Sequence, residues 1–439
     1  PPSLRRLSGR RRLIAAQLQA RHAWRMAVIV IVSVLAGLAA AYFARLCDWA
    51  METQEGLYAA RPAFAVMLLP MGFALAVWIT RRFAPEAAGS GIPQVIAAAE
   101  QRWRGRWGGR RVTLRTAAWK VVLAVWMLIC GASIGREGPT VQVAAGVTRT
   151  LTRGLRGGPG RRAMIIAGGA AGVAAAFNTP IAGVVFAFEE LGRSFERRTH
   201  TTVILVVVVA GFTAYALQGD YAYFGALGRD SDLRAAWLAA PVLGVIGGLT
   251  GGLFSRALAW VIGPRDNPLT RWRRARPVLF AFLCGLAAAG AALASGGVTF
   301  GAGYLEARAL LHHDGAGGLN LAGWKFVATL AAAISGAPGG IFAPSLAIGA
   351  GMGSALSETY LAFAGREAVV LGMAGYLSGV VQAPLTSAVI LMEMTRDPGL
   401  VAPLMLTSLL ARWVSALIMP TPIYHVLAEV WRLTPRQPG

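Results

Sequence analysis

The sequence predicts an all-α polytopic membrane protein, built from two related halves whose helices are tilted and broken. Three observations lead to this fold class: an apolar composition, long stretches without charge, and motifs that recur about 205 residues further along the chain. Of the 439 residues, 56% are hydrophobic and only 14% are charged. Soluble domains carry about 25% charged residues. A water-soluble globular domain is therefore disfavoured.

Eight charge-free stretches provide the expected membrane spans, since a helix needs roughly 20 apolar residues to cross a bilayer. They cover residues 26–44, 62–80, 163–188, 201–219, 235–255, 277–305, 326–357 and 369–392. The stretches of 26, 29 and 32 residues are too long for one simple span and too short for two. Because they contain glycine and proline, we expect broken or tilted helices, which a membrane protein tolerates where irregular backbone lines a cavity.

The positions of the basic residues along the chain indicate what the positive charge does. The formal net charge is +22, and Lys120 and Lys325 are the only lysines, so arginine carries nearly all of it. The arginines gather in four clusters between apolar stretches, in residues 1–25, 102–115, 149–162 and 256–276. Basic loops beside apolar spans mark the cytoplasmic side of a membrane protein. We therefore expect a lipid bilayer as partner and no nucleic acid, with multiple passes and cytoplasmic termini.

The polar chemistry of the chain offers no metal or cofactor site. Three cysteines are scattered, mostly within apolar stretches: Cys47, Cys130 and Cys284. Their spacing supports neither a disulfide framework nor a metal site. The only histidine pair, in His312-His313-Asp314, has no spaced partner and is more typical of a loop. We expect no metal and no cofactor. A membrane-embedded enzyme is also disfavoured, because no nucleophile with its base stands out.

An internal repeat organises the chain. A first group of residues returns 205 positions later (344 − 139 = 205), with Trp119-Lys120, Gly131-Ala132, Gly135 and Pro139 matching Trp324-Lys325, Gly336-Ala337, Gly340 and Pro344. A second group returns at an offset of 204, with Gly168, Pro180 and Glu189 matching Gly372, Pro384 and Glu393. A looser echo relates Gly89-Ser90-Gly91 to Gly301-Ala302-Gly303. Paired halves with interrupted segments indicate a transporter or channel whose site lies where the halves meet. The alternative is chance similarity between Gly/Ala-rich helices, which the shared Trp-Lys and Pro-to-Glu spacings disfavour.

The repeat and the charge clusters together predict five segments. These are a basic cytoplasmic N-terminal segment (1–25), a first membrane repeat (26–263), a basic linker (264–276), a second membrane repeat (277–430) and a C-terminal tail (431–439). The boundary between the halves is placed in the linker because the charge is concentrated there.

Three short segments place glycine just before a proline that opens an apolar stretch. They are Gly89-Ser90-Gly91-Ile92-Pro93, Gly135-Arg136-Glu137-Gly138-Pro139 and Gly339-Gly340-Ile341-Phe342-Ala343-Pro344. Proline is favoured in the first helical turn, where unpaired N–H groups carry about half a positive charge. Three such helix ends, if they converge, would bind an anion weakly enough to release it. Glycine-mediated helix packing is the alternative explanation of any one segment alone.

These segments, with Pro422-Ile423-Tyr424, closely resemble the four anion-site motifs of the CLC chloride channel and transporter family, and the resemblance runs from about residue 25 to 430. The resemblance implies two inverted-topology repeats and a homodimer with one anion pathway per subunit. It points to the bacterial type of the family and to its Cl⁻/H⁺ exchangers, which implies the cell (inner) membrane and chloride and protons as partners.

The resemblance also assigns an anion site. The chloride ligands would be two hydroxyls and two backbone N–H groups, those of Ser90, Tyr424, Ile341 and Phe342. Five glycines would support the backbone around them: Gly89, Gly91, Gly135, Gly138 and Gly340. A hydroxyl donates a hydrogen bond without adding charge, which suits a weak anion site. Without the resemblance, the serine is explained as a helix N-cap and the tyrosine as an interfacial residue.

Two carboxylates complete the expected site. Glu137 matches the external gating glutamate of the family, which competes with chloride for the pathway and carries protons. Glu190 matches the internal proton-transfer glutamate of its exchangers. Ionisable residues within membrane segments are functional candidates by default, although Glu137 could instead pair with a nearby arginine. Of Glu189 and Glu190, the sequence cannot show which points inward, and we expect Glu189, like its repeat counterpart Glu393, to be a structural helix cap. The resulting hypothesis is a chloride/proton antiporter, with a passive chloride channel as the alternative.

Overall fold

The protein is helical throughout the part that the structure describes. This computed structural model describes residues 2–100, 111–155, 160–192, 197–219, 223–225, 231–312, 317–360 and 364–433, without the side chains of residues 2–14, 197–199 and 433. Within these ranges it contains 18 α-helices and no β-strand. The predicted all-α fold is confirmed.

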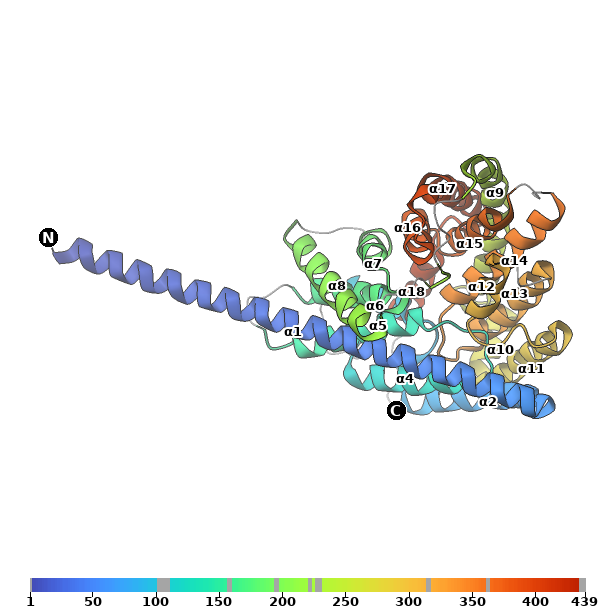
Figure 1. Cartoon of the computed structure of the whole chain (residues 1–439). Coiled ribbons are helices and arrows are strands. Elements are labelled where there is room, and N and C mark those ends of the chain that lie inside the picture. The colour runs from blue at the N-terminus through green and yellow to red at the C-terminus, as the bar shows by residue number, and fades with distance from the viewer. Residues whose placement is uncertain are drawn as a thin grey trace.

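The helices fall into two groups along the chain. The first comprises α1 (Pro2–Ala60), α2 (Pro62–Phe83), η1 (Pro85–Ala87), α3 (Ile92–Glu100), α4 (Leu114–Ile129), α5 (Glu137–Leu151), α6 (Arg161–Phe177), α7 (Pro180–Phe186), η2 (Ala187–Leu191) and α8 (Arg197–Gln218). The second comprises α9 (Leu233–Ile262), α10 (Pro268–Ala275), α11 (Pro277–Ser295), α12 (Tyr304–Leu311), α13 (Gly318–Ser335), α14 (Phe342–Thr359), α15 (Gly365–Val381), α16 (Pro384–Thr395), η3 (Pro398–Leu400), α17 (Val401–Ile418) and α18 (Ile423–Leu433). The first group is coloured blue to green and the second green to red in Figure 1.

The long charge-free stretches are broken, as predicted. In the stretch 163–188, Asn178 ends α6 in the left-handed conformation (φ 58°) and Pro180 opens α7. The stretch 369–392 is shorter than the three for which a break was predicted, and it is interrupted in the same way: Gln382 (φ 62°) ends α15 and Pro384 opens α16. A left-handed residue ends a helix and a proline suits the first turn of the next. The two breaks are repeat equivalents, 204 residues apart.

Several helices escaped the charge-free search because they carry charge, and α4 and α17 are the longest of them. Helix α4 contains Arg115 and Lys120, and α17 contains Arg412. The buried lysine of α4 is satisfied by backbone carbonyls, so it does not prevent the segment from being helical and interior. A search for stretches without any charged residue does not find such helices.

Long apolar helices surround a core of shorter ones. Among the described residues, six helical segments are long and apolar enough to cross a membrane, in α1, α2, α8, α9, α11 and α17. Their outer faces expose large apolar side chains such as Phe64, Phe212, Trp237 and Leu417. This is the surface that a lipid bilayer covers. The protein is therefore a multi-pass membrane protein.

The inner helices approach one another through glycine. A Cβ atom at Gly372 of α15 would lie 2.4 Å from the carbonyl oxygen of Gly349 in α14, and the reverse substitution meets the carbonyl of Gly372 at the same distance. In the first half, a Cβ at Gly172 of α6 would lie 2.7 Å from the carbonyl oxygen of Thr140 in α5. Small residues at such crossings allow backbones to pack closely in membranes. The equivalent pairs α5/α6 and α14/α15 thus form the tightly packed interior.

The halves are related by an inverted two-fold arrangement, and reciprocal contacts mark its axis. Gly135 and its equivalent Gly340 form an antiparallel pair, in which each N–H donates to the other carbonyl at 2.8 and 2.9 Å. The carboxylate of Glu189 accepts from the first N–H groups of α16, and that of Glu393 accepts from those of α7. Around a two-fold axis, a contact from the first half to the second is matched by the equivalent contact from the second half to the first. The two inverted-topology repeats are thus confirmed.

Helix α9 lies with the second group. It packs against α13, α15 and α17, as α1 packs against α4, α6 and α8. Figure 1 shows it beside α15 and α17, while α1 runs along the first group and extends beyond it toward the N-terminus. The division of the chain at residues 264–276 remains a prediction, and this packing favours a boundary before α9. The described part of α1 is also one helix through the expected segment 1–25.

Candidate anion site

Three helix N-termini start from one point between the halves. The loops before α5 and α14 are joined by the Gly135–Gly340 pair, and the N–H of Gly339 donates to the carbonyl of Gly89, before α3, at 3.1 Å. The three Gly-Pro segments that the sequence singled out are thus hydrogen-bonded to one another. Their helices direct unpaired N–H groups and partial positive charge toward the same region.

Glycine is required where these loops touch. A Cβ at Gly138 would lie 2.3 Å from Oγ of Ser90, and one at Gly91, where φ is 109°, would lie 2.7 Å from the carbonyl oxygen of Gly138. A Cβ at Gly340 would lie 2.9 Å from the carbonyl oxygen of Gly135. Any side chain would force the helix ends apart, so the glycines permit the convergence. Gly89 also has a positive φ, of 62°.

The structure places Ser90 and Tyr424 as neighbours at this point. Tyr424 is fully buried at the start of α18, and its ring stacks on that of Phe342, the first residue of α14, with centroids 6.1 Å apart and planes at 6°. A fourth helix N-terminus therefore joins the other three. The rings of Phe177 and Phe186 also pack against the Phe342 ring, with centroids 6.1 and 6.0 Å away.

The hydroxyls of Ser90 and Tyr424 lie beside each other and do not cap a helix. The N–H of Gly91 donates to Oε1 of Gln94 at 3.1 Å, so the glutamine caps the start of α3 and Ser90 does not. Among the described residues, neither the Ser90 hydroxyl nor the Tyr424 hydroxyl has a hydrogen-bond partner of ordinary length, although both oxygens are buried. Buried polar groups are normally satisfied. With the N-terminal end of α14 at Ile341 and Phe342 beside them, these hydroxyls suit an anion.

Glu137 lies in the same cluster and contacts both halves. It is the first residue of α5 and only 1% exposed. Its Oε2 lies 3.4 Å from the backbone N of Ala343 in α14, and its Oε1 accepts the hydroxyl of Tyr304 in α12. The carboxylate thus occupies a position at a helix N-terminus that an anion would favour.

The neighbouring arginine has a different partner. Nη1 of Arg136 donates to Oδ1 of Asp48 at 2.6 Å and to the carbonyl of Ala44 at 3.0 Å, both in α1. Nη2 donates to the hydroxyl of Tyr223 at 2.5 Å. The side chain of Arg136 is 3% exposed and that of Asp48 is 48% exposed. This geometry disfavours the alternative that Glu137 is merely the partner of an adjacent arginine.

The two adjacent glutamates of the first half have different surroundings. Glu189 accepts from the backbone N of Leu385 at 3.0 Å and of Thr386 at 2.6 Å, so it is a helix cap, as expected, at the start of α16. Glu190 is 1% exposed, and its Oε1 lies 3.7 Å from Nε2 of His425. Both glutamates lie in η2, a single turn of π-helix, and such turns are frequent at functional sites. The two adjacent side chains thus point to different partners, Glu189 to α16 and Glu190 to α18.

Sequence reasoning missed two side chains that contact the carboxylates. Tyr304 follows Gly301-Ala302-Gly303, the echo of the serine motif, so aligning the repeats one residue further would have singled it out. His425 directly follows Tyr424, and only the fold brings it to Glu190. Among the described residues no group of three or more side chains could hold a metal. His313 and Asp314 lie outside these residues.

Taken together, the site and the fold define a polytopic membrane protein in which helix N-termini from both halves surround buried hydroxyls and a carboxylate. The chain belongs to the voltage-gated chloride channel family, whose sequence model matches residues 71–416. This is a family of ion transporters and channels rather than of enzymes.

Solved structures agree with this assignment. The chain is similar to a slow cyanobacterial Cl⁻/H⁺ antiporter, with 26% identity, a TM-score of 0.78, and coverage of 93% of this chain and 98% of that chain. It shares its fold with a eukaryotic CLC transporter, at 22% identity and a TM-score of 0.73 over 92% of this chain and 74% of that one. It also shares it with a CLC-type fluoride/proton antiporter, at 21% identity and a TM-score of 0.76 over 91% and 96%.

Proposed function

We propose that this protein exchanges chloride for protons across the membrane. One observation carries the proposal: the buried carboxylate of Glu137 lies at the N-terminus of α14, beside the hydroxyls and helix ends of the anion site. The similarity to a Cl⁻/H⁺ antiporter supports it. Chloride would be bound by the hydroxyls of Ser90 and Tyr424 and by the backbone N–H groups of Ile341 and Phe342.

The coupling follows from charge. Ionised, Glu137 is itself an anion and competes with chloride for the positive ends of the helices. Protonated, it is neutral, loses that attraction and can leave the pathway to chloride. Each cycle in which the carboxylate gives its place to chloride then moves a proton. Glu190, buried beside His425, would exchange that proton with the other side of the membrane.

A direct test is ion flux in proteoliposomes. An imposed chloride gradient should drive protons against their own gradient, because one carboxylate serves both ions. A passive chloride channel, the alternative function, would carry chloride without any uphill proton movement. Absence of uphill movement with intact chloride flux would replace the antiporter by the channel.

Replacing Glu190 with glutamine should abolish proton transport and leave chloride flux largely intact. The amide keeps the shape of the side chain and cannot release a proton, while the chloride ligands lie on other helices. Glu189→Gln is the matched control, since Glu189 is the adjacent carboxylate and caps α16. The control should keep proton transport. An unchanged exchange ratio in Glu190→Gln would remove Glu190 from the proton route.

Assembly and location are part of the same proposal. We expect a homodimer with one pathway per subunit in the cell (inner) membrane, with cytoplasmic termini set by the basic clusters. The exposed apolar residues of α8 and α17, among them Phe212, Leu409 and Leu417, offer a surface for a second copy. Cross-linking in liposomes measures this assembly directly.

A further inference from the structure

The carboxylate of Glu137 is held from the second half of the chain by a side-chain hydroxyl. Tyr304 is the first residue of α12, and its hydroxyl donates to Oε1 of Glu137. The other oxygen, Oε2, faces the backbone N of Ala343 at 3.4 Å. Both oxygens of the carboxylate therefore have a donor from the second half, and only one of these donors is a side chain that substitution can remove.

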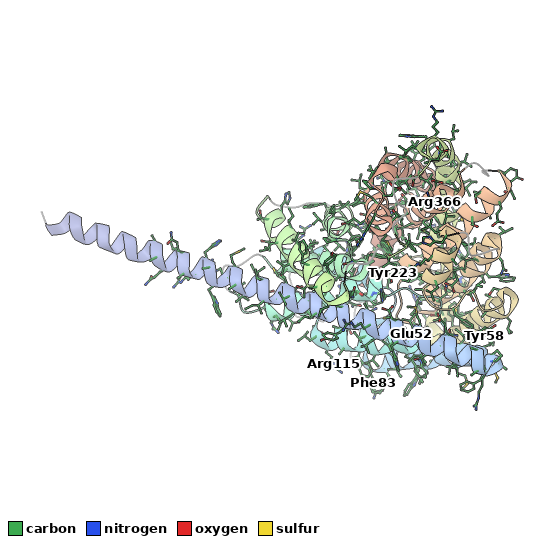
Figure 2. All side chains as sticks on the ribbon, in the orientation of Figure 1. Glu52, Tyr58, Phe83, Arg115, Tyr223 and Arg366 are labelled. Atoms are coloured by element: carbon green, nitrogen blue, oxygen red, sulfur yellow. The ribbon has the colours of Figure 1, made fainter. Side chains whose placement is uncertain are left out.

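The ring of Tyr304 is itself fixed by aromatic contacts. It packs against Tyr223 with centroids 4.3 Å apart and against Phe224 at 6.2 Å. The hydroxyl of Tyr223 is in turn bound to Arg136, which pairs with Asp48. Figure 2 labels Tyr223 within the helical body, between the two groups of helices in this view. The hydroxyl of Tyr304 is thus directed at the carboxylate by a packed cluster and not by a flexible chain.

We propose that Tyr304 is a positioning residue that holds the ionised Glu137 in the anion pathway, so that its hydroxyl sets the pH at which the carboxylate leaves. The inference rests on the proposed function, in which departure of Glu137 opens the path to chloride. A hydroxyl that donates to a carboxylate stabilises the ionised form more than the neutral one. Without the Tyr304 hydroxyl, Glu137 should become protonated at a lower proton concentration, which means at a higher pH.

The other groups that face Glu137 do not duplicate this contact. The charged and titratable ones are Cys47 of α1, Arg136 before α5 and Tyr424 of α18, while Asp48 of α1 and Tyr223 in the segment 223–225 contact Arg136. The positive group among them, Arg136, is bound to Asp48. Within the part of the chain that the structure describes, the Tyr304 hydroxyl and the Ala343 N–H are the groups outside α5 that donate directly to the carboxylate. This makes the single hydroxyl of Tyr304 a specific target.

The test is the pH profile of chloride flux in proteoliposomes with equal pH on both sides. Flux should rise as the pH falls, because protonation frees the pathway. In Tyr304→Phe the midpoint of this rise should move to higher pH by about one to two units, the value of one hydrogen bond to a charged group. Tyr376→Phe is the matched control, because its hydroxyl is also buried but lies in α15, without a partner among the described residues. It should keep the parent midpoint.

A double substitution separates positioning from structural support. In a Glu137→Gln background no carboxylate remains to be held, so Tyr304→Phe should change neither the flux nor its pH profile. Tyr304→Phe keeps the ring that packs against Tyr223 and Phe224 and removes only the hydroxyl, so the fold is expected to persist.

Two results would overturn the inference. In the first, the folded Tyr304→Phe protein has the same pH midpoint of chloride flux as the parent protein. In the second, Tyr304→Phe changes the flux equally in the presence of Glu137 and in the Glu137→Gln background. Failure of the proposed function looks different: the parent protein would then show no uphill proton transport, or proton transport would survive in Glu137→Gln.

Discussion

Replacing Glu137 with glutamine is expected to abolish proton transport while chloride continues to flow. The amide is neutral at every pH, so it neither carries a proton nor competes with chloride as an anion for the helix ends. Its side chain keeps the volume of glutamate, and the chloride ligands remain in place. Proton uptake into proteoliposomes should fall to the leak of protein-free vesicles, and chloride flux should lose its pH dependence. Both quantities are measured in the same vesicles.

The control for this substitution is another buried glutamate. Glu367 of α15 is 6% exposed and accepts a hydrogen bond from the backbone of Asp232, away from the anion site. Glu367→Gln removes a buried charge of the same kind and should leave proton transport unchanged. Proton transport that survives in Glu137→Gln would mean that a different group couples the two ions. The antiporter mechanism given above would then fail at its central residue.

How far the sequence leads can be judged from particular residues. Helix spans, broken stretches and the internal repeat follow from composition and from glycine and proline, because these act locally. The three Gly-Pro segments could be recognised for the same reason. Their convergence, however, depends on long-range pairs such as Gly135–Gly340, and a sequence search sees only that the two glycines are repeat equivalents.

The contacts of the carboxylates were beyond local reasoning. Tyr304 is separated from Glu137 by 167 residues, and nothing near either residue identifies the other as a partner. Similarly, Glu189 and Glu190 are adjacent and identical in type, and only the fold shows that the first caps α16 and the second lies beside His425. Pairings across an inverted repeat are set by the axis between the halves. The repeat offset predicts the axis but not the side chains that meet on it.

The contacts of the two buried lysines also could not be predicted from the sequence, and they lead to a prediction about stability. Lys325 is fully buried, and its Nζ donates to three successive carbonyls, those of Thr299 at 3.0 Å, Phe300 at 2.9 Å and Gly301 at 3.0 Å. Its equivalent Lys120 has one short contact, 2.7 Å to the carbonyl of Gly89, and a longer one of 3.5 Å to that of Ala88. Each lysine therefore ties down the loop that precedes a short helix of the site.

Lys325→Met should be strongly destabilising, more so than Lys120→Met. Methionine fills a similar volume but donates nothing, and each buried carbonyl left without a partner costs about 1–3 kcal/mol. With three carbonyls unsatisfied, the free energy of unfolding falls by several kcal/mol. This is a large share of the roughly 5–15 kcal/mol by which a typical domain is stable. The measurement is the midpoint of thermal unfolding in detergent, which should fall further for Lys325→Met. Equal midpoints for the two variants would show that the additional carbonyl contacts contribute little.

The same substitution connects stability to gating. The loop that Lys325 holds ends at Tyr304, whose hydroxyl donates to Glu137, whereas the loop that Lys120 holds leads to Ser90. Where the variants still fold, Lys325→Met should therefore move the pH profile of chloride flux in the same direction as Tyr304→Phe. Lys120→Met should instead weaken chloride binding, measured by calorimetry, and leave the profile in place. Two results would contradict this: a shift of the pH profile in Lys120→Met, or an unshifted profile in a folded Lys325→Met. Either would show that Lys325 does not act through the contact between Tyr304 and Glu137. If the expected pattern is found, each buried lysine orders one loop of the anion site, one for the anion ligand and one for the gating carboxylate.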